Sequence, residues 1–97
     1  MVVLRHETWI FADSMRSGVA SRKHDDLDAK VSGPGDLSHV YYASSHEEAM
    51  QTHYEQQGWG RYKPMPGVTD AAYPAERLEQ QLVDYPDDAQ LRALNGL

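Results

Sequence analysis

The 97-residue chain contains no cysteine, which excludes disulfide bonds, thiolate metal ligands and a thiol nucleophile. Long apolar runs are also missing, because no such run exceeds four residues, as in Trp9–Ala12. A bilayer-spanning helix needs about 20. The first residues carry no basic stretch followed by an apolar one, so we expect no signal peptide. These absences predict a cytoplasmic protein without membrane contact, and the length predicts a single domain over residues 1–97.

Basic residues are scarce relative to acidic ones. The chain has nine lysines and arginines against fifteen aspartates and glutamates, for a net charge of −6. Residues 64–97 hold six of the acids and two of the bases, a net charge of −4. Binding to duplex DNA requires a basic face, so this composition argues against it. An acidic surface instead attracts a protein partner with a basic surface.

Signatures of common catalytic sites are missing as well. The chain has no G-x-S-x-G nucleophile elbow, no P-loop and no G-x-G-x-x-G dinucleotide motif. The glycines at 33 and 35 flank Pro34, which lacks the N–H group that a phosphate cradle would use. We therefore expect a non-enzymatic protein that needs no cofactor.

The first half of the chain is typical of β structure. Residues 2–12 alternate between two faces and are rich in β-branched and aromatic side chains, which predicts a strand, most clearly over residues 7–12. Residues 13–18 have turn chemistry. The residues after them are ambiguous: a returning strand from Val19 to about His24 competes with a helix that begins at Ser17 or Ser21 and buries Leu27 and Val31. A loop over 32–36 and a second clear strand over 38–43 follow.

A helix from His46 to about Gln57 is the best-marked element. Ser45 and Glu48 form a capping box at its start, and Gly58 is a suitable residue to end it. Its predicted inner face has helical spacing and comprises Ala49, Met50, His53, Tyr54 and Gln57, while His46 is expected to be exposed.

Two shorter helices are expected at the C-terminal end. Pro74 suits the first turn of one that runs to Asp84 or Tyr85, and Pro86 opens the other, with Asp87 and Asp88 in its first turn and Gly96 at its end. We expect them to bury the apolar residues Leu78, Leu82, Tyr85, Leu91 and Leu94.

The order of these elements predicts an α+β fold. A small antiparallel sheet of about three strands is packed by one central helix and two short C-terminal helices, with the helices on one face of the sheet.

Residues 59–63, Trp-Gly-Arg-Tyr-Lys, form what we call the aromatic segment. Trp, Tyr and Arg dominate the energetics of protein interfaces, and the prolines at 64 and 66 stiffen this loop. The competing interpretation is that Trp59 plugs the open end of the core. We expect Trp59 to be partly buried, and Arg61 and Tyr62 to point outward.

The expected function is that of a small acidic inhibitor or regulatory protein, a protein-binding module that occludes its partner. Immunity proteins and phage-encoded inhibitors, including anti-CRISPR proteins, are similar in size and charge, which is an analogy and not a likeness in residues. The predicted partner-binding residues are Trp59, Arg61, Tyr62 and Lys63 of the aromatic segment, together with carboxylates that would mimic phosphates, Glu76, Glu79, Asp84, Asp87 and Asp88.

Two other functions remain open. In one, the aromatic segment binds a single-stranded nucleic acid or a small ligand by stacking. In the other, His39, His46 and His53 serve an orphan enzyme or a metal site, although His46 and His53 are about 10 Å apart along one helix and do not have chelating spacing. Residues 24–28 combine a histidine with three aspartates but lack the EF-hand pattern, so we interpret them as a solvated acidic turn.

Overall fold

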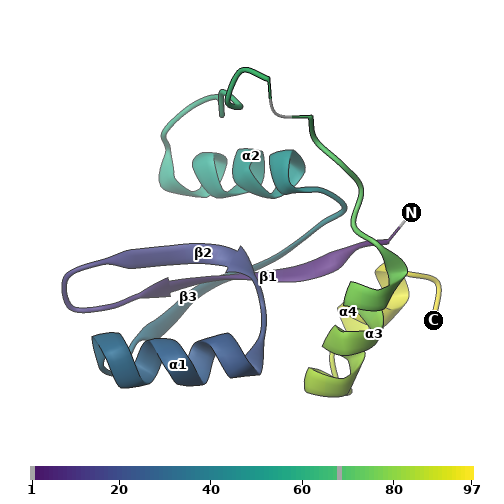
Figure 1. Cartoon of the computed structure of the whole chain (residues 1–97), viewed down its shortest axis with the longest axis horizontal. Coiled ribbons are helices and arrows are strands. Elements are labelled where there is room, and N and C mark those ends of the chain that lie inside the picture. Colours follow the sequence, from purple (N-terminus) through teal and green to yellow (C-terminus); the bar gives the residue numbers. More distant parts are fainter. Residues whose placement is uncertain (1, 68) are drawn as a thin grey trace.

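The computed structural model describes residues 2–67 and 69–97, except for the side chains of residues 24, 25, 28 and 32. It confirms the α+β class, with a three-stranded antiparallel sheet and helices that precede and follow its last strand (Figure 1). In chain order the elements are β1 (Leu4–Ile10), β2 (Met15–Val19), α1 (Arg22–Ser32), β3 (Asp36–Ala43), α2 (His46–Gln57), α3 (Ala75–Asp84) and α4 (Ala89–Leu94).

β1 is the central strand of the sheet, with β2 on one side and β3 on the other. Both neighbours run antiparallel to β1, so that His6 lies opposite Val19 on one side and Tyr41 on the other. The register between β1 and β3 shifts after Thr8, which makes Ser38 an extra residue in β3. Such a bulge bends an edge strand and discourages further pairing along it.

The segment after β1 differs from the prediction. The turn is confined to residues 11–14, where the Phe11 N–H donates to the carbonyl of Ser14 at 2.8 Å, and β2 begins at Met15 rather than at Val19. Ser17, which suggested a turn, lies within β2, and its hydroxyl bonds the hydroxyls of Thr8 and Tyr41. These cross-strand hydrogen bonds satisfy a polar residue inside the sheet, which propensity alone does not reveal.

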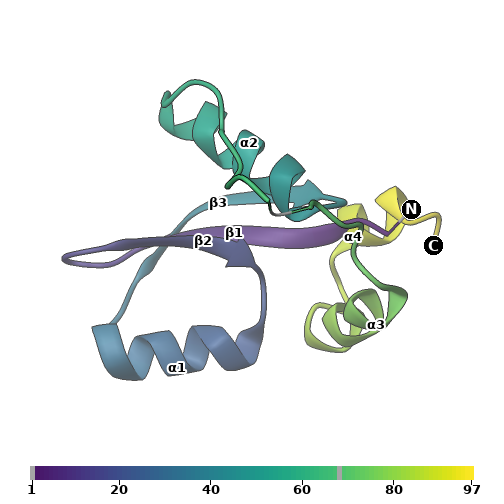
Figure 2. The same ribbon diagram turned by 45° about the horizontal axis from the view of Figure 1, so that its top comes forward.

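Residues 14–31 contain both of the structures that the sequence left open, because β2 is followed directly by α1. The helix begins after Ser21, one of its two predicted starts. The prediction that Leu27 and Val31 are buried is wrong: both are exposed, Val31 to 86%. Figure 2 shows α1 running beside the sheet, and the exposure of Leu27 and Val31 means that they add little to the core.

Helices lie on both faces of the sheet, which corrects the expectation of a single covered face. α2 lies over one face, and α1 and α3 lie over the other (Figure 2). The physical reason is in β1, where Leu4, His6 and Thr8 point to one side and Arg5 and Glu7 to the other. Of these, only Arg5 is not buried, so both faces of β1 need cover.

The core under α2 combines one large side chain with two small ones. Tyr41 and Ala43 of β3 pack against Ala49 of α2. Because Ala43 and Ala49 are small, the helix can come close to the sheet at this point. Polar groups are nearly as common as apolar ones among the buried described residues, and include His6, Thr8 and the side chain of Gln81. Buried polar groups need partners, so hydrogen bonds carry much of the specificity of this fold.

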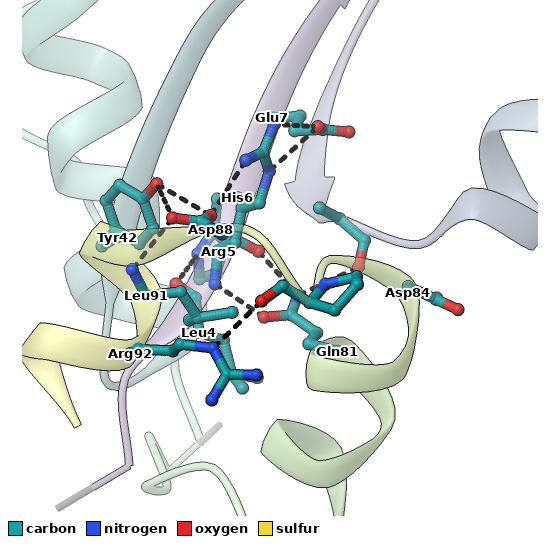
Figure 3. A network of polar contacts seen from close by, with 12 residues as sticks. Leu4, Arg5, His6, Glu7, Tyr42, Gln81, Asp84, Asp88, Leu91 and Arg92 are labelled. Carbon is teal, nitrogen blue, oxygen red and sulfur yellow. Dashed lines mark hydrogen bonds and ion pairs between the residues drawn. The ribbon is translucent and has the colours of Figure 1, made fainter. Parts of the chain in front are cut away.

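Two side-chain amides attach the C-terminal helices to β1 beyond the end of β2. The Gln81 amide of α3 accepts from the backbone N–H of Arg5 at 2.8 Å and donates to the carbonyls of Arg5 at 2.9 Å and Ala20 at 3.0 Å (Figure 3). Asn95, just after α4, binds the N–H and the carbonyl of Val3 in the same way, both at 2.8 Å. The two amides thus supply hydrogen-bond partners for backbone groups that a neighbouring strand would otherwise bind.

The expected burial of the C-terminal helices holds in part. Tyr85 and Leu91 are buried, whereas Leu78 and Leu82 are half-buried and Leu94 is exposed. α4 also begins later than expected, at Ala89, because Asp88 is its N-cap and accepts from the N–H of Leu91 at 3.0 Å.

α2 has the predicted bounds. The Ser45 hydroxyl accepts from the N–H of Glu48 at 3.3 Å, and Gly58 ends the helix in the left-handed conformation with φ of 73°. The other half of the capping box is shifted by one residue, because the Glu48 carboxylate accepts from the N–H and the hydroxyl of Ser44, each at 3.1 Å. Of the predicted inner face, Ala49 and His53 are buried, and Met50, Tyr54 and Gln57 are half-buried.

We expect Ser45→Ala to lower the free energy of unfolding by about 1 kcal/mol, the usual effect of removing an N-cap hydroxyl. Ser14→Ala, in the exposed turn between β1 and β2, is the matched control and is expected to change it by less than about 0.5 kcal/mol. Urea unfolding of the two variants measures the difference. Equal values would show that Ser45 does not hold the start of α2.

In the part of the chain that the structure describes, no helix is both long and apolar enough to cross a membrane.

Candidate functional site

The aromatic segment leaves α2 in a fixed direction. Gly58 adopts a positive φ that a side chain would disfavour, and the N–H of Trp59 then reaches back to the carbonyl of Tyr54 at 2.9 Å. This hydrogen bond places the indole ring beside the last turn of the helix. The position of Trp59 therefore follows from how the helix ends.

Trp59 is partly buried, as expected, and is still 55% exposed. Its ring meets the rings of His53 and Tyr54 edge-on, with both centroid distances 5.3 Å. Tyr54 in turn meets Tyr62 edge-on at 5.2 Å. Edge-to-face contacts of this kind are favourable beyond the area they bury, so the four rings form a continuous aromatic cluster that extends from the buried His53 to the exposed Trp59 and to Tyr62.

The segment is held to α2 by polar contacts as well. The N–H of Tyr62 donates to the side-chain oxygen of Gln51 at 3.0 Å. Further along, Asp70 accepts from the N–H of Glu47 at 3.3 Å, and a hydrogen bond from the Ser45 hydroxyl is the main reason that the pKa of Asp70 is lowered. The loop is thus attached at its beginning and near its end, and the aromatic groups sit on an ordered backbone.

A buried histidine anchors the strand-like stretch that follows the loop. His6 Nδ1 lies 3.0 Å from the carbonyl of Leu4, which only accepts, so Nδ1 carries the proton and Nε2 accepts from the Tyr73 hydroxyl at 2.9 Å. Burial lowers the pKa of His6 to about 4. The ring is therefore neutral at pH 7 and acts as a structural link between the sheet and Tyr73.

Two open hollows flank the aromatic segment. One has a volume of about 370 Å³ and a mainly apolar lining that includes His46, Tyr62, Pro64, Met65 and Ala71. The other, of about 440 Å³, is more polar and is lined by residues that include Glu48, Gln51, Arg61 and Asp70. Tyr62 and Pro64 line both hollows, so the recesses lie near the end of the segment, while the exposed Trp59 is at its beginning.

The other predicted residues of the segment take different positions. Arg61 and Lys63 are exposed, whereas Tyr62 is half-buried against α2, so the expectation that Arg61 and Tyr62 both point outward holds for Arg61 alone. Met65, which sequence reasoning did not select, is 73% exposed. Its signal in the sequence is its place between Pro64 and Pro66, which keeps it out of any helix or strand.

The predicted carboxylates differ in their exposure. Glu76 and Glu79 are exposed on α3, and Asp87 is exposed before α4. Asp84 is half-buried at the end of α3, where its backbone carbonyl accepts from Nε of Arg22.

Asp88, by contrast, belongs to a buried polar network (Figure 3). Its side chain is only 6% exposed, forms an ion pair with Arg5 at 2.9 Å and accepts from the Tyr42 hydroxyl at 3.0 Å. Arg5 also pairs with Glu7 at 2.9 Å, and Glu7 accepts from Nε1 of Trp9 at 3.1 Å. The structure thus gives Asp88 a structural role that leaves it little surface for a partner.

The Asp88 carboxylate stays ionised in this setting. Burial acts to raise its pKa, but hydrogen bonds from the Leu91 N–H, Arg5 and Tyr42, together with the charge of Arg5, outweigh burial and lower the pKa below its ordinary value. The sequence offered no local signal for this pair, because Arg5 and Asp88 lie at opposite ends of the chain.

The three histidines of the metal hypothesis take separate roles. His46 is exposed at the start of α2 and meets Tyr62 edge-on, and His39 bonds the Ser38 hydroxyl through Nδ1 at 2.9 Å. His53 is buried, which lowers its pKa, with a smaller effect from the charge of His39. Among the described residues, no group of three or more histidines and carboxylates has the arrangement of a metal site. In the acidic stretch at 24–28, the side chains of His24, Asp25 and Asp28 lie outside the part of the chain that the structure describes.

Comparisons with protein-family models, with curated proteins and with solved structures find no match to this chain.

Proposed function

We propose that this chain is a non-enzymatic protein-binding module that acts in the cytoplasm and contacts its partner with the surface around the aromatic segment. The observation that carries the proposal is Trp59: its indole is more than half exposed, yet two rings and a backbone hydrogen bond hold it in place. An exposed tryptophan on an ordered loop loses little entropy when it binds, and tryptophan is the residue type most often found at interface hot spots.

The neighbourhood of Trp59 supports the same proposal. Met65 is exposed nearby in the sequence, and an apolar hollow lies between Met65 and Tyr62. Methionine adapts its shape to a partner, and an apolar recess can receive a side chain of a complementary protein surface.

The charge of the chain indicates the kind of partner. With a net charge of −6 and exposed carboxylates at Glu76, Glu79 and Asp87, the protein attracts a partner that has a basic surface and increases the rate at which the two meet. A small acidic module that covers a basic functional surface would act as an inhibitor or regulator of the partner. The proposal of inhibition or regulation rests on charge and size. The aromatic surface supports only the proposal that the protein binds a partner.

A single-stranded nucleic acid is the second candidate, favoured by the exposed Arg61 and Lys63 on either side of Tyr62. Stacking proteins usually offer several exposed rings, however, and here Tyr62 is packed against Tyr54 and His46. Trp59 is then the one platform that the segment presents, so a protein partner is the better-supported proposal.

We expect Trp59→Ala to keep the fold, with a loss of about 1 kcal/mol of unfolding free energy from its ring contacts, and to abolish capture of the partner. The experiment compares proteins and nucleic acids recovered from cell lysate by the wild-type protein, Trp59→Ala and Val83→Ala. Val83 is an exposed apolar residue on α3 and serves as the matched control.

The proposal expects at least one protein that the wild type and Val83→Ala recover and Trp59→Ala does not. An identical set of proteins in all three samples, or none in the wild-type sample, would contradict it. Recovery of oligonucleotides that depends on Trp59 would favour the second candidate.

A further inference from the structure

A separate groove lies on the face of the sheet opposite α2. It has a volume of about 540 Å³, its floor is formed by β1 and β3, and its walls are formed by α1 on one side and residues 85–88 on the other. Figure 2 shows α1 and α3 on this side of the sheet. The lining residues used below are Trp9, Arg22, Asp26, Leu37, Tyr85 and Asp87.

The positive charges in this groove already have partners within the protein. Arg5 is paired with Glu7 and Asp88 and lies over the ring of Tyr85 at 4.6 Å. Arg22 lies over the same ring at 4.7 Å and donates to the backbone carbonyl of Asp84. Arg5 is therefore neutralised by two carboxylates, and Arg22, although exposed, lies against Tyr85.

The remaining charge of the groove is negative. Its lining contains four carboxylates, Glu7, Asp26, Asp87 and Asp88, and two guanidinium groups, so it carries a net charge of −2. Asp26 and Asp87 are both exposed and lie on opposite walls. Among the described residues neither of them takes part in an ion pair.

The floor between these walls combines the charged Arg5 and Glu7 with an apolar part, Trp9 and Leu37, that is partly open. Leu37 is 43% exposed, and Trp9 beside it is half-buried with its indole N–H directed to Glu7. A lysine or arginine side chain has an apolar stem and a cationic head, which match such a floor and such walls, and an indole face attracts a cation directly.

We infer that this groove binds a basic segment of a partner protein, with a lysine or arginine side chain lying over Trp9 and Leu37 and its charge between Asp26 and Asp87. This inference shares with the proposed function that the partner is a protein and that it carries basic groups. It concerns the opposite face of the sheet from the aromatic segment, so each of the two surfaces can be tested alone.

The test uses hexalysine as the probe and hexaglutamate as the peptide control. The protein carries Trp59→Phe, so that Trp9 is the one tryptophan that reports binding by fluorescence. A second protein adds Asp26→Asn and Asp87→Asn, and a third adds Glu76→Gln and Glu79→Gln, which remove the same charge from an exposed face outside the groove lining.

We expect hexalysine, and not hexaglutamate, to change the Trp9 fluorescence. The Asp26→Asn/Asp87→Asn protein should bind hexalysine about tenfold more weakly, as the loss of two partly exposed charge contacts predicts. The Glu76→Gln/Glu79→Gln protein should differ less than about twofold. Equal weakening in both proteins would mean that hexalysine recognises only the overall negative charge and would overturn the inference, as would the absence of any binding. Because Trp59 is replaced throughout, the result is independent of the proposed function.

Discussion

Asp88→Ala is expected to lower the free energy of unfolding by about 3 kcal/mol. This is the lower end of the range for removing one partner of a buried ion pair, because the Asp88 side chain is buried but Arg5 is only half-buried. The variant removes one of the two carboxylates that pair with Arg5, and it removes the acceptor of the Tyr42 hydroxyl. It also removes the N-cap of α4, where Asp88 accepts from the N–H of Leu91. Arg5 keeps its contact with Glu7, which is why the larger values in that range are not expected.

The neighbouring residue provides the control. Asp87→Ala removes the same charge from an exposed position and is expected to change stability by less than about 0.5 kcal/mol. Asp88→Asn retains an oxygen that can cap α4 while it removes the charge, so its loss should lie between the other two. Urea denaturation measures all three. If Asp88→Ala and Asp87→Ala unfold at the same urea concentration, the network in Figure 3 does not stabilise the fold.

Gln81→Ala is expected to cost a similar amount, about 3 kcal/mol. Gln81 is only 3% exposed, and its amide is the partner of the Arg5 N–H and of the carbonyl of Ala20. Water has little access to these two backbone groups once the amide is gone, and a buried group left without a partner costs roughly 1–3 kcal/mol. α3 would also lose its attachment to β1.

Gln80→Ala is a closely matched control, because Gln80 is the preceding residue of the same helix and is exposed. Gln80→Ala raises helix propensity as much as Gln81→Ala does, but it removes no buried hydrogen bond. Gln81→Glu adds a second comparison, since a carboxylate would face the carbonyls of Arg5 and Ala20 and should be at least as destabilising as alanine. Thermal melts that do not distinguish Gln80→Ala from Gln81→Ala would show that the amide does not link α3 to β1.

Local signals explain what the sequence predicted well. The bounds of α2 follow from Ser45 and Gly58, because a cap acts on groups within one helical turn of itself. The alternation in β1 and the predicted strand that became β3 are local in the same sense. The partial burial of Trp59 also follows from a neighbouring residue, since Gly58 turns the chain back onto α2.

Contacts between distant parts of the chain explain what the sequence did not predict. Gln81 and Asn95 lie in or next to helices, where polar residues normally face water. Gln81 is buried and Asn95 is half-buried because they bind backbone groups of Arg5 and Val3, 76 and 92 residues away. Likewise, the sequence gives Asp88 the character of a surface carboxylate, and its structural role depends on contacts with the distant residues Arg5 and Tyr42. The cover on both faces of the sheet has the same origin, because α3 is held on its side by Gln81.

The most direct test of the proposed function is a calorimetric titration of the purified captured partner with the wild-type protein and with Trp59→Ala, each paired with a melt. We expect the Kd to rise about 30-fold, the equivalent of a hot-spot loss of about 2 kcal/mol, while unfolding free energy falls by only about 1 kcal/mol. Val83→Ala should match the wild type in both measurements. An unchanged Kd for Trp59→Ala, or a loss of binding that merely follows the loss of folded protein, would contradict the role of Trp59 as a binding anchor.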